Sequence, residues 1–288
     1  MSDLPAEIAA KRDRLLQLLK SYGSCAVAFS GGLDSAVLAK AAQLALGDRA
    51  VAATGVSASL AVGELDEARE VARQIGIRHE VIETAELTLP EYQENTANRC
   101  YFCKTELFEQ VERLAERLSV AVVADGSNRD DHGEHRPGIR AARDQEVRSP
   151  LAECGFTKPE LRALAEHWEL PVWDKPATPC LSSRIAYGEK VTPERLAMVD
   201  QAERFLRDQG FKPLRVRYHK GDVARIEVAP EGLSRFTDEP FRREVVDRLK
   251  SIGFRYVSLD LEGFRSGSLN AVLPVESLEI SGGQGGRR

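Results

Sequence analysis

The sequence predicts an α/β protein in which a doubly wound parallel sheet is followed by a smaller α/β domain. Short apolar runs without polar interruption, such as Cys25–Phe29, are typical of strands buried on both faces. Charged or amphipathic segments of helical length separate these runs, and repeated strand–helix units produce parallel sheets. After Tyr187 the pattern changes to long helices and an alternating hairpin, which indicates a second unit.

Strands and helices alternate in the first part of the chain. Residues 1–23 contain an amphipathic helix, whose inward-facing residues are Ile8, Leu15, Leu16 and Leu19. Further helices are expected at 35–46, 63–75, 105–118 and 157–170. Strands are expected at 25–29, 50–56, 79–82, 119–124 and 171–174. Thr157 fits the N-cap of the last helix, and Pro159 fits its first turn.

The second part of the chain has a different order of elements. The expected elements are a helix at 191–211, a hairpin at 214–228 that turns at 220–222, a helix at 239–254 and a strand at 255–264. We therefore predict a first domain at 1–187 and a second domain at 188–275, with a role in substrate binding or oligomerisation. Residues 276–288 have too little apolar content to fold, which predicts a disordered tail.

Composition limits the class of protein. The chain has 288 residues, 42% of them hydrophobic, and a formal net charge of −5, which gives no general reason to expect nucleic-acid binding. No apolar run approaches the roughly 20 residues needed to span a bilayer, and a signal-peptide core is absent, so we expect a cytoplasmic protein without a membrane partner. In that compartment five cysteines favour a metal, a cluster or catalysis over disulfides. Cys25 and Cys154 are expected to be inert thiols.

A glycine-rich turn joins the first buried strand to the next helix. The residues that we expect to bind a cofactor here are Ser30, Gly31, Gly32, Asp34 and Ser35. The glycines let the backbone approach a ligand closely, and the helix N-terminus favours an anion. The stretch has neither a G-x-x-x-x-G-K-S/T nor a G-x-G-x-x-G pattern. It therefore predicts a phosphate-binding loop of another kind, and the alternative is a plain strand–helix turn.

Three cysteines are candidate metal ligands. Cys100 and Cys103 have C-x-x-C spacing just before a predicted helix, and Cys180 lies in a Pro-rich loop. Three cysteines without a fourth fit a cuboidal iron–sulfur cluster with one iron free of protein, whereas a closed zinc site would need a fourth ligand. Zinc or unligated thiols remain as alternatives. His132 and His135 are able to bind zinc but lie in a polar loop.

A polar loop follows the strand that ends near residue 124. Asp125 and Gly126 lie at the carboxyl end of that strand and are also expected to bind the cofactor; Asn128, Asp130 and Asp131 follow them. Because ligands bind at the carboxyl ends of parallel strands, these carboxylates are candidates to hold magnesium or to activate an acceptor. The alternative for Asp130 and Asp131 is a solvated turn.

Arginines mark the hairpin of the second domain. Arg215 and Arg217 are two residues apart on one strand, so their side chains share a face of the sheet. Together with Arg184, in the loop of Cys180, they favour binding of a phosphate or carboxylate. An exposed, solvated face is the alternative.

The loop at 30–35 resembles the SGGxDS motif of the PP-loop ATP pyrophosphatases. That resemblance implies an adenine-nucleotide hydrolase-like fold, ATP with Mg2+ as the cofactor, and attack of a substrate oxygen on the α-phosphate of ATP. Over nearly the whole chain, stretches such as "SSRIAYG" and "GFRYVSLDLEGFRSG" resemble the LarE family of ATP-dependent sulfur transferases, which act in nickel-pincer cofactor biosynthesis. The family implies adenylation of a pyridinium-3,5-biscarboxylic acid mononucleotide and replacement of its carboxylate oxygen by sulfur.

Roles follow from the same resemblance. Ser183 and Arg184 correspond to residues that line the reaction site, and Arg215 and Arg217 to residues that bind the substrate phosphate. Two metal-binding roles fall on Glu203 and Glu227. The expected partners are a small-molecule nucleotide and sulfide or a sulfur-donating protein, and the expected state is a homo-oligomer.

One position departs from part of the family. Some relatives donate sulfur from a cysteine five residues before the arginine of the SSR motif, where this chain has Pro179. The three-cysteine set instead resembles that of cluster-bearing members, which predicts sulfur delivery through a 4Fe-4S cluster. A tRNA-thiolating PP-loop enzyme and a zinc-containing nucleotide-binding regulator are the alternatives, and the acidic balance disfavours the first.

Overall fold

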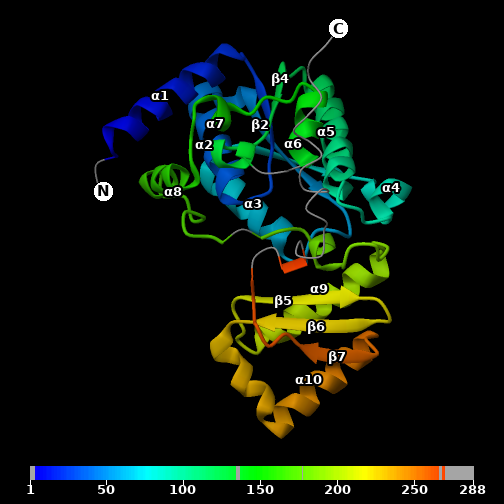
Figure 1. The fold of residues 1–288 in the computed structure, drawn as a ribbon. Coiled ribbons are helices and arrows are strands. Elements are labelled where there is room, and N and C mark those ends of the chain that lie inside the picture. The colour runs from blue at the N-terminus through cyan, green and yellow to red at the C-terminus, as the bar shows by residue number, and fades with distance from the viewer. Residues whose placement is uncertain (1–3, 134–136, 177, 266–267, 270–288) are drawn as a thin grey trace, which may run out of the picture. The chain divides into compact units, whose positions relative to one another are not determined.

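The computed structural model describes residues 4–133, 137–176, 178–265 and 268–269. Its contacts divide the chain into two compact units. The first comprises Met1–Glu86 and Cys100–Thr178, and the second comprises Leu87–Arg99 and Pro179–Arg288. Figure 1 shows the elements of both units. Among the described residues, none of the helices has the length and apolar character needed to cross a membrane.

A four-stranded parallel sheet forms the centre of the first unit. Its strands are β1 (Cys25–Ala28), β2 (Ala50–Val56), β3 (Arg78–Glu83) and β4 (Val122–Ala124), in the order β3-β2-β1-β4. Each neighbouring pair is parallel, so the carboxyl ends of all four strands lie at one edge. The predicted doubly wound parallel sheet is confirmed.

Helices cover both faces of this sheet. They are α1 (Ala6–Ser21), α2 (Leu33–Leu46), α3 (Glu64–Ile75), α5 (Arg99–Leu118), α6 (Pro137–Asp144), α7 (Pro150–Glu153) and α8 (Lys158–His167). Cys25 and Val27 pack into a core with α1, α2 and α8, whereas Ala26 packs against α5. Figure 1 shows these two sets of helices on opposite sides of the strands. Burial of alternate residues on both faces explains why β1 is apolar throughout.

Two predictions for the first unit are wrong. Residues 171–174 form a turn instead of a strand, because the amide of Trp173 donates to the carbonyl of Leu170 and so bends the backbone. The C-x-x-C motif does not precede a helix, since α5 begins at Arg99 and includes both cysteines. Leu16, expected to face inward, is partly buried and packs against the core. The capping box of Thr157 and Glu160 at the start of α8 is as predicted.

The second unit contains a three-stranded sheet in the order β5-β6-β7. β5 (Leu214–His219) and β6 (Val223–Val228) form the predicted antiparallel hairpin, and β7 (Tyr256–Leu259) pairs parallel to β6. Helix α9 (Pro193–Asp208) packs against β5, and α10 (Glu239–Ile252) packs against β7. The short helix α4 (Pro90–Gln93) belongs to the same unit.

The units divide at a different place from the predicted domains. Residues 179–187 and the segment 87–99, both expected in the first domain, belong to the second unit. The reason is a contact between these two segments, because the side chain of Asn95 donates to three carbonyls between residues 185 and 189. The predicted tail at 276–288 lies outside the described residues.

Candidate active site

The turn after β1 lies at the carboxyl edge of the parallel sheet, and close backbone packing shapes it. Gly31 has φ +68°, and a Cβ there would lie 2.9 Å from the Cα of Ala68 on α3. At Gly126, after β4, a Cβ would lie 3.0 Å from the backbone nitrogen of Ser35. Only glycine satisfies both the conformation of the first position and the close approach at the second.

Hydroxyl groups complete the turn. The Ser35 hydroxyl donates to the Gly32 carbonyl at 3.1 Å and accepts from the Ser30 amide at 3.2 Å. Gly32 is the N-cap of α2 and provides no side-chain cap, so the first N–H groups of this helix have no side-chain acceptor at that position. Uncapped N–H groups and the positive end of the helix dipole form a site for an anion such as a phosphate.

A lysine that the sequence analysis missed lies at this turn. The Lys158 ammonium is 2.5 Å from the Asp34 carboxylate, and its backbone amide donates to Asp130 at 2.8 Å. Lys158 is the first residue of α8, whose capping box holds that helix end in place. The loop motif has no lysine of its own, and α8 supplies one from 124 residues away in sequence. The capping box shows where α8 begins, but no sequence signal places that end beside residue 34.

The carboxylates after β4 are engaged in the loop itself. Asp125 is buried and accepts from the Ser149 hydroxyl at 2.7 Å, and from the Ser127 hydroxyl at 2.7 Å. The carboxylate of Asp131 accepts from the Asn128 amide at 2.9 Å. These contacts favour a role in loop shape. Within the described part of the chain, no group of three or more His, Cys, Asp or Glu side chains is placed to hold a metal ion.

The cysteines fall into two kinds. Cys25 and Cys154 are buried, and burial raises the pKa of both thiols, that of Cys25 to about 12, so they stay protonated. Cys100 and Cys180 are exposed and Cys103 is half-buried, and no disulfide joins any of the five. Cys100 and Cys103 belong to the first unit and Cys180 to the second. The side chains of His132 and His135 lie outside the described residues.

Arg184 is buried and braces the loop that carries Cys180. Its guanidinium makes two parallel bonds to Glu203, at 3.0 and 3.1 Å, and donates to the Cys180 carbonyl at 2.9 Å. It also donates to the Pro179 carbonyl. Glu203 in turn accepts from the Val216 amide at 3.1 Å. Arg184 and Glu203 therefore already have hydrogen-bond partners within the second unit.

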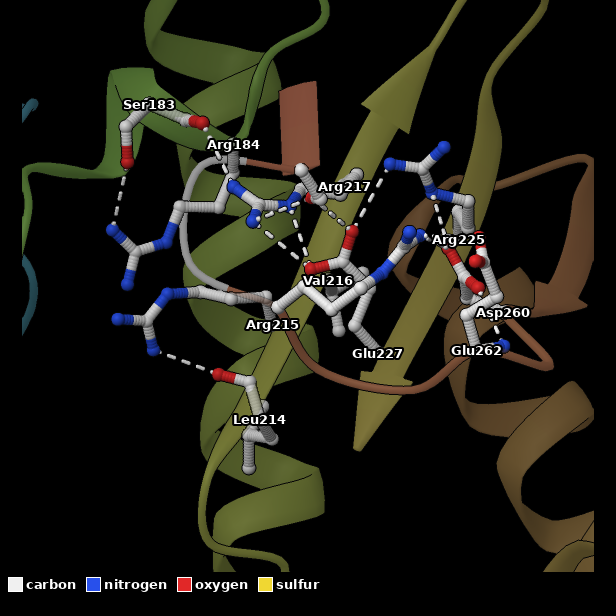
Figure 2. Close-up of polar contacts among 12 residues, drawn as sticks. Ser183, Arg184, Leu214, Arg215, Val216, Arg217, Arg225, Glu227, Asp260 and Glu262 are labelled. Carbon is white, nitrogen blue, oxygen red and sulfur yellow. Dashed lines mark hydrogen bonds and ion pairs between the residues drawn. The ribbon is translucent and has the colours of Figure 1, made fainter. Parts of the chain in front are cut away.

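Arg217 is held in a similar way. It donates to one oxygen of Glu227 at 2.9 and 3.1 Å and to the Ser183 carbonyl at 3.0 Å (Figure 2). Glu227 is fully buried and also accepts from Arg225 at 3.0 Å and from the Ser268 hydroxyl at 2.6 Å. The two glutamates expected to bind metal are thus partners of arginines.

Arg215 differs from its neighbours. Its guanidinium donates to the Leu214 carbonyl at 2.7 Å and lies 5.3 Å from the Phe264 ring centre, and no described carboxylate forms an ion pair with it. Burial, followed by repulsion from Arg184 and Arg217, lowers the Arg215 pKa to about 10. Figure 2 shows its guanidinium directed to the same side as that of Arg184. A bound anion would offset both the desolvation cost of the buried Arg215 charge and its repulsion by the other two arginines.

Comparisons with known proteins identify the family. The asparagine synthase family matches residues 16–99, which include the loop at 30–35. The chain is 36% identical over 274 residues to pyridinium-3,5-bisthiocarboxylic acid mononucleotide synthase of Lactiplantibacillus plantarum, covering 95% of this chain and 98% of that protein. It is 46% identical over 266 residues to the uncharacterized protein slr1717 of Synechocystis sp., covering 92% of this chain and 99% of that one. The chain belongs to the LarE family of PP-loop ATP-dependent sulfurtransferases.

Proposed function

We propose that the protein adenylates a carboxylate of pyridinium-3,5-biscarboxylic acid mononucleotide and replaces its oxygen by sulfur, in nickel-pincer cofactor biosynthesis. The observation that carries this proposal is the uncapped, glycine-shaped turn at 30–35 in a chain aligned over 95% of its length with a bisthiocarboxylic acid mononucleotide synthase. The turn supports binding of the nucleotide ATP, and the activity for which the relative is named supports the identity of the substrate that is adenylated.

The first unit would bind ATP. The N–H groups at the start of α2 bind phosphate oxygens, and Lys158 neutralises their charge once it leaves Asp34. The Asp34 carboxylate would then bind Mg2+, which prefers oxygen ligands and would neutralise the leaving pyrophosphate. Ser30 and Ser35 hold the turn in shape, and Asp125 and Gly126 support it from the side of β4.

The reaction has two balanced steps. An oxygen of the substrate carboxylate attacks the α-phosphorus of ATP, and pyrophosphate leaves with the electron pair of the broken P–O bond. Sulfide then attacks the carbonyl carbon of the acyl-adenylate, and AMP leaves with the original carboxylate oxygen. The products are a thiocarboxylate, AMP and pyrophosphate, and the sulfur comes from sulfide or from a sulfur-donating protein.

The second unit would bind the nucleotide substrate. Arg215 has no carboxylate partner in the described part of the chain and so is the arginine available to a substrate phosphate. Arg217 and Arg184 are held by Glu227 and Glu203, and they fix the position of Ser183 through its carbonyl and its hydroxyl. The Ser183 hydroxyl lies on the exposed side of the loop, where a substrate can reach it.

Cys100, Cys103 and Cys180 are proposed to hold a 4Fe-4S cluster. They fit in chemistry, because the two exposed thiols and the half-buried one belong to no disulfide. When bound, such a cluster would supply an iron with a coordination position for sulfide. Pro179 stands where a sacrificial cysteine would be, so this chain has no one-use donor at that position.

Product analysis tests the proposal. The protein is incubated anaerobically with ATP, magnesium, sulfide and the biscarboxylic mononucleotide, and the products are identified by mass spectrometry. We expect AMP, pyrophosphate and a substrate in which one oxygen is replaced by sulfur. Asp34→Ala should stop all three without unfolding the protein, because its side chain lies outside the hydrophobic core. ADP and inorganic phosphate as products, or sulfur transfer to tRNA instead, would contradict the proposal.

A further inference from the structure

The loop at 179–189, which carries Cys180 and Ser183, is held by side-chain donors on its backbone carbonyls. Arg184 donates to the carbonyls of Pro179 and Cys180. Arg217 donates to the carbonyl of Ser183 (Figure 2). Most loop carbonyls in proteins bond to other backbone groups or to water. Repeated use of charged side chains for this purpose indicates a loop kept in one conformation.

Asn95 holds the second half of this loop. Its side-chain amide donates to the carbonyls of Ile185 at 3.2 Å, Ala186 at 2.8 Å and Glu189 at 3.0 Å. Asn95 is fully buried and adopts φ +54°, a left-handed conformation that asparagine tolerates better than most residues. Its backbone carbonyl also accepts from the Gly188 amide at 3.3 Å. One residue thus contacts the loop at four positions.

Arg99 holds the first half. One nitrogen of its guanidinium donates to the Ser182 carbonyl at 2.8 Å and to the Asn95 side chain at 2.5 Å. The Ser182 hydroxyl is hydrogen-bonded to that of Tyr92 at 2.6 Å. All these groups are buried. The segment 92–99 therefore binds the loop through side chains that also bind one another.

We infer that Asn95 and Arg99 are positioning residues that hold the loop 179–189 in the conformation needed for sulfur transfer. They act on backbone carbonyls, and through them fix the places of the Cys180 thiol and the Ser183 hydroxyl. Positioning of this kind matters because a misplacement of about 1 Å in a reacting group can reduce the rate about a hundredfold. The link to sulfur transfer rests on the function proposed above, whereas the link to the loop conformation does not.

Hydrogen exchange of the whole protein tests the inference directly. The reporter is the peptide at 181–189, in which the amides of Ser183, Ile185, Ala186 and Gly188 are hydrogen-bonded. The variants are Arg99→Met, which removes two N–H donors, and Asn95→Asp, which turns the amide donor into an acceptor facing three carbonyls. Arg99→Lys tests rescue, because an ammonium can also donate to two oxygens. Arg113→Met, at an exposed position of the same helix, is the matched control.

We expect exchange at 181–189 to be about tenfold faster in Arg99→Met and in Asn95→Asp. The first variant loses charge-assisted hydrogen bonds, and the second loses the three bonds from the Asn95 amide to loop carbonyls. Exchange in β5 should stay unchanged, Arg99→Lys should restore much of the protection, and Arg113→Met should match the parent. The apparent ATP affinity should be unchanged in each variant, and the sulfur-transfer rate should fall in the first two.

Two results would overturn the inference. The first is unchanged protection at 181–189 in both Arg99→Met and Asn95→Asp. The second is equal loss of protection in the loop and in β5, which would show that these residues hold only the unit as a whole. Neither measurement needs substrate or a cluster. If the parent protein showed no sulfur transfer but the loop lost protection selectively in the two variants, the proposed function would fail and the loop assignment would stand.

Discussion

The two loops proposed to take part in the reaction are stabilised by different means. The loop at 30–35 depends on backbone geometry: a glycine with positive φ against Ala68, a second glycine against Ser35 and an uncapped helix end. The loop at 179–189 depends on buried side chains, with Arg99, Arg184 and Arg217 donating to its carbonyls. The first leaves backbone N–H groups for a ligand, and the second engages its backbone carbonyls and presents side chains instead.

This difference matches the chemistry proposed for each loop. A triphosphate is recognised by many N–H donors, which a backbone turn supplies without side-chain entropy loss. A cysteine that holds a cluster and a hydroxyl that contacts a substrate need fixed positions, which buried and hydrogen-bonded supports provide. Substitutions should therefore act through backbone conformation in the first loop and through lost side-chain partners in the second.

Among substitutions that act through backbone conformation, the largest effect is expected at Gly31. In Gly31→Ala the added methyl group meets Ala68 and the positive φ costs about 1–2 kcal/mol. The turn must shift, and we expect pyrophosphate formation to fall about a hundredfold or more. The matched control is Gly76→Ala, which has φ +76° but nothing within 4 Å of the added Cβ.

Both variants should lose thermal stability by the cost of the conformation, but only Gly31→Ala should lose pyrophosphate formation, measured by a coupled assay. Equal activity of the two variants would show that the close packing of the first loop has no role in the reaction.

The second loop carries Cys180, and we expect repeated turnover to need this cysteine together with Cys100 and Cys103 on α5. Cys100→Ala, Cys103→Ala and Cys180→Ala should each abolish multiple turnovers with sulfide, since a cluster with two cysteine ligands is not retained. Cys154→Ala, which removes a buried thiol outside this set, should keep turnover. Mass spectrometry of the reacted protein should find the Cys180 peptide at full mass. Loss of the mass of hydrogen sulfide from that peptide, in proportion to product, would instead mean that Cys180 is a sacrificial donor.

Features that depend on backbone conformation were easier to predict from the sequence than features that depend on side-chain contacts. The parallel sheet and the first loop were predictable because apolar runs and paired glycines are local signals of buried strands and backbone turns. The strand expected at 171–174 was wrong because a short apolar run such as "PVWD" does not distinguish a strand from a turn, and in this turn only Val172 is buried. The start of the helix that contains the C-x-x-C motif was predicted too late in the sequence. Its first residue, Arg99, contacts Ser182 outside the helix, and this contact has no local signal in the sequence.

The partners of charged residues could not be predicted. Arg215 and Arg217 are equivalent in the sequence pattern, yet only Arg217 reaches Glu227. Lys158 and Asp34 are 124 residues apart, and Asn95 is 90 from the carbonyl of Ile185. Such contacts depend on how loops fold over the sheet ends, for which a single sequence holds no local signal. The roles of these residues therefore emerge only from the three-dimensional arrangement.

A third prediction separates the two arginines of β5. Arg217→Met removes a partner from the fully buried Glu227, and breaking a buried ion pair costs about 3 kcal/mol or more. Arg215→Met removes no ion pair among the described residues and relieves the repulsion from Arg184 and Arg217, so stability should change little. Denaturant unfolding measures this contrast.

Activity should show the reverse selectivity. Arg215→Met should raise the KM for the nucleotide substrate about tenfold or more, with the KM for ATP unchanged, because the lost contact is one charge-assisted bond to a phosphate. Arg215→Lys should restore only part of the affinity for the nucleotide substrate, since lysine cannot form the two parallel hydrogen bonds of a guanidinium. If both variants bound substrate like the parent and were equally stable, the hairpin arginines would be a solvated surface.

The smallest effect is expected at Lys158, which adds a positive charge to a loop shaped mainly by its backbone. Without ATP the lysine is partly exposed and paired with Asp34, and exposed ion pairs contribute little to stability. Lys158→Met should therefore leave the free energy of unfolding nearly unchanged. If the ammonium moves to a phosphate when ATP binds, the same change should raise the KM for ATP about tenfold. Lys175→Met, which breaks an ion pair with Glu67 on α3, is the matched control and should leave that KM unchanged. A rise in KM for both variants would indicate a general electrostatic effect, and no rise for Lys158→Met would mean that the first loop binds phosphate through its backbone alone.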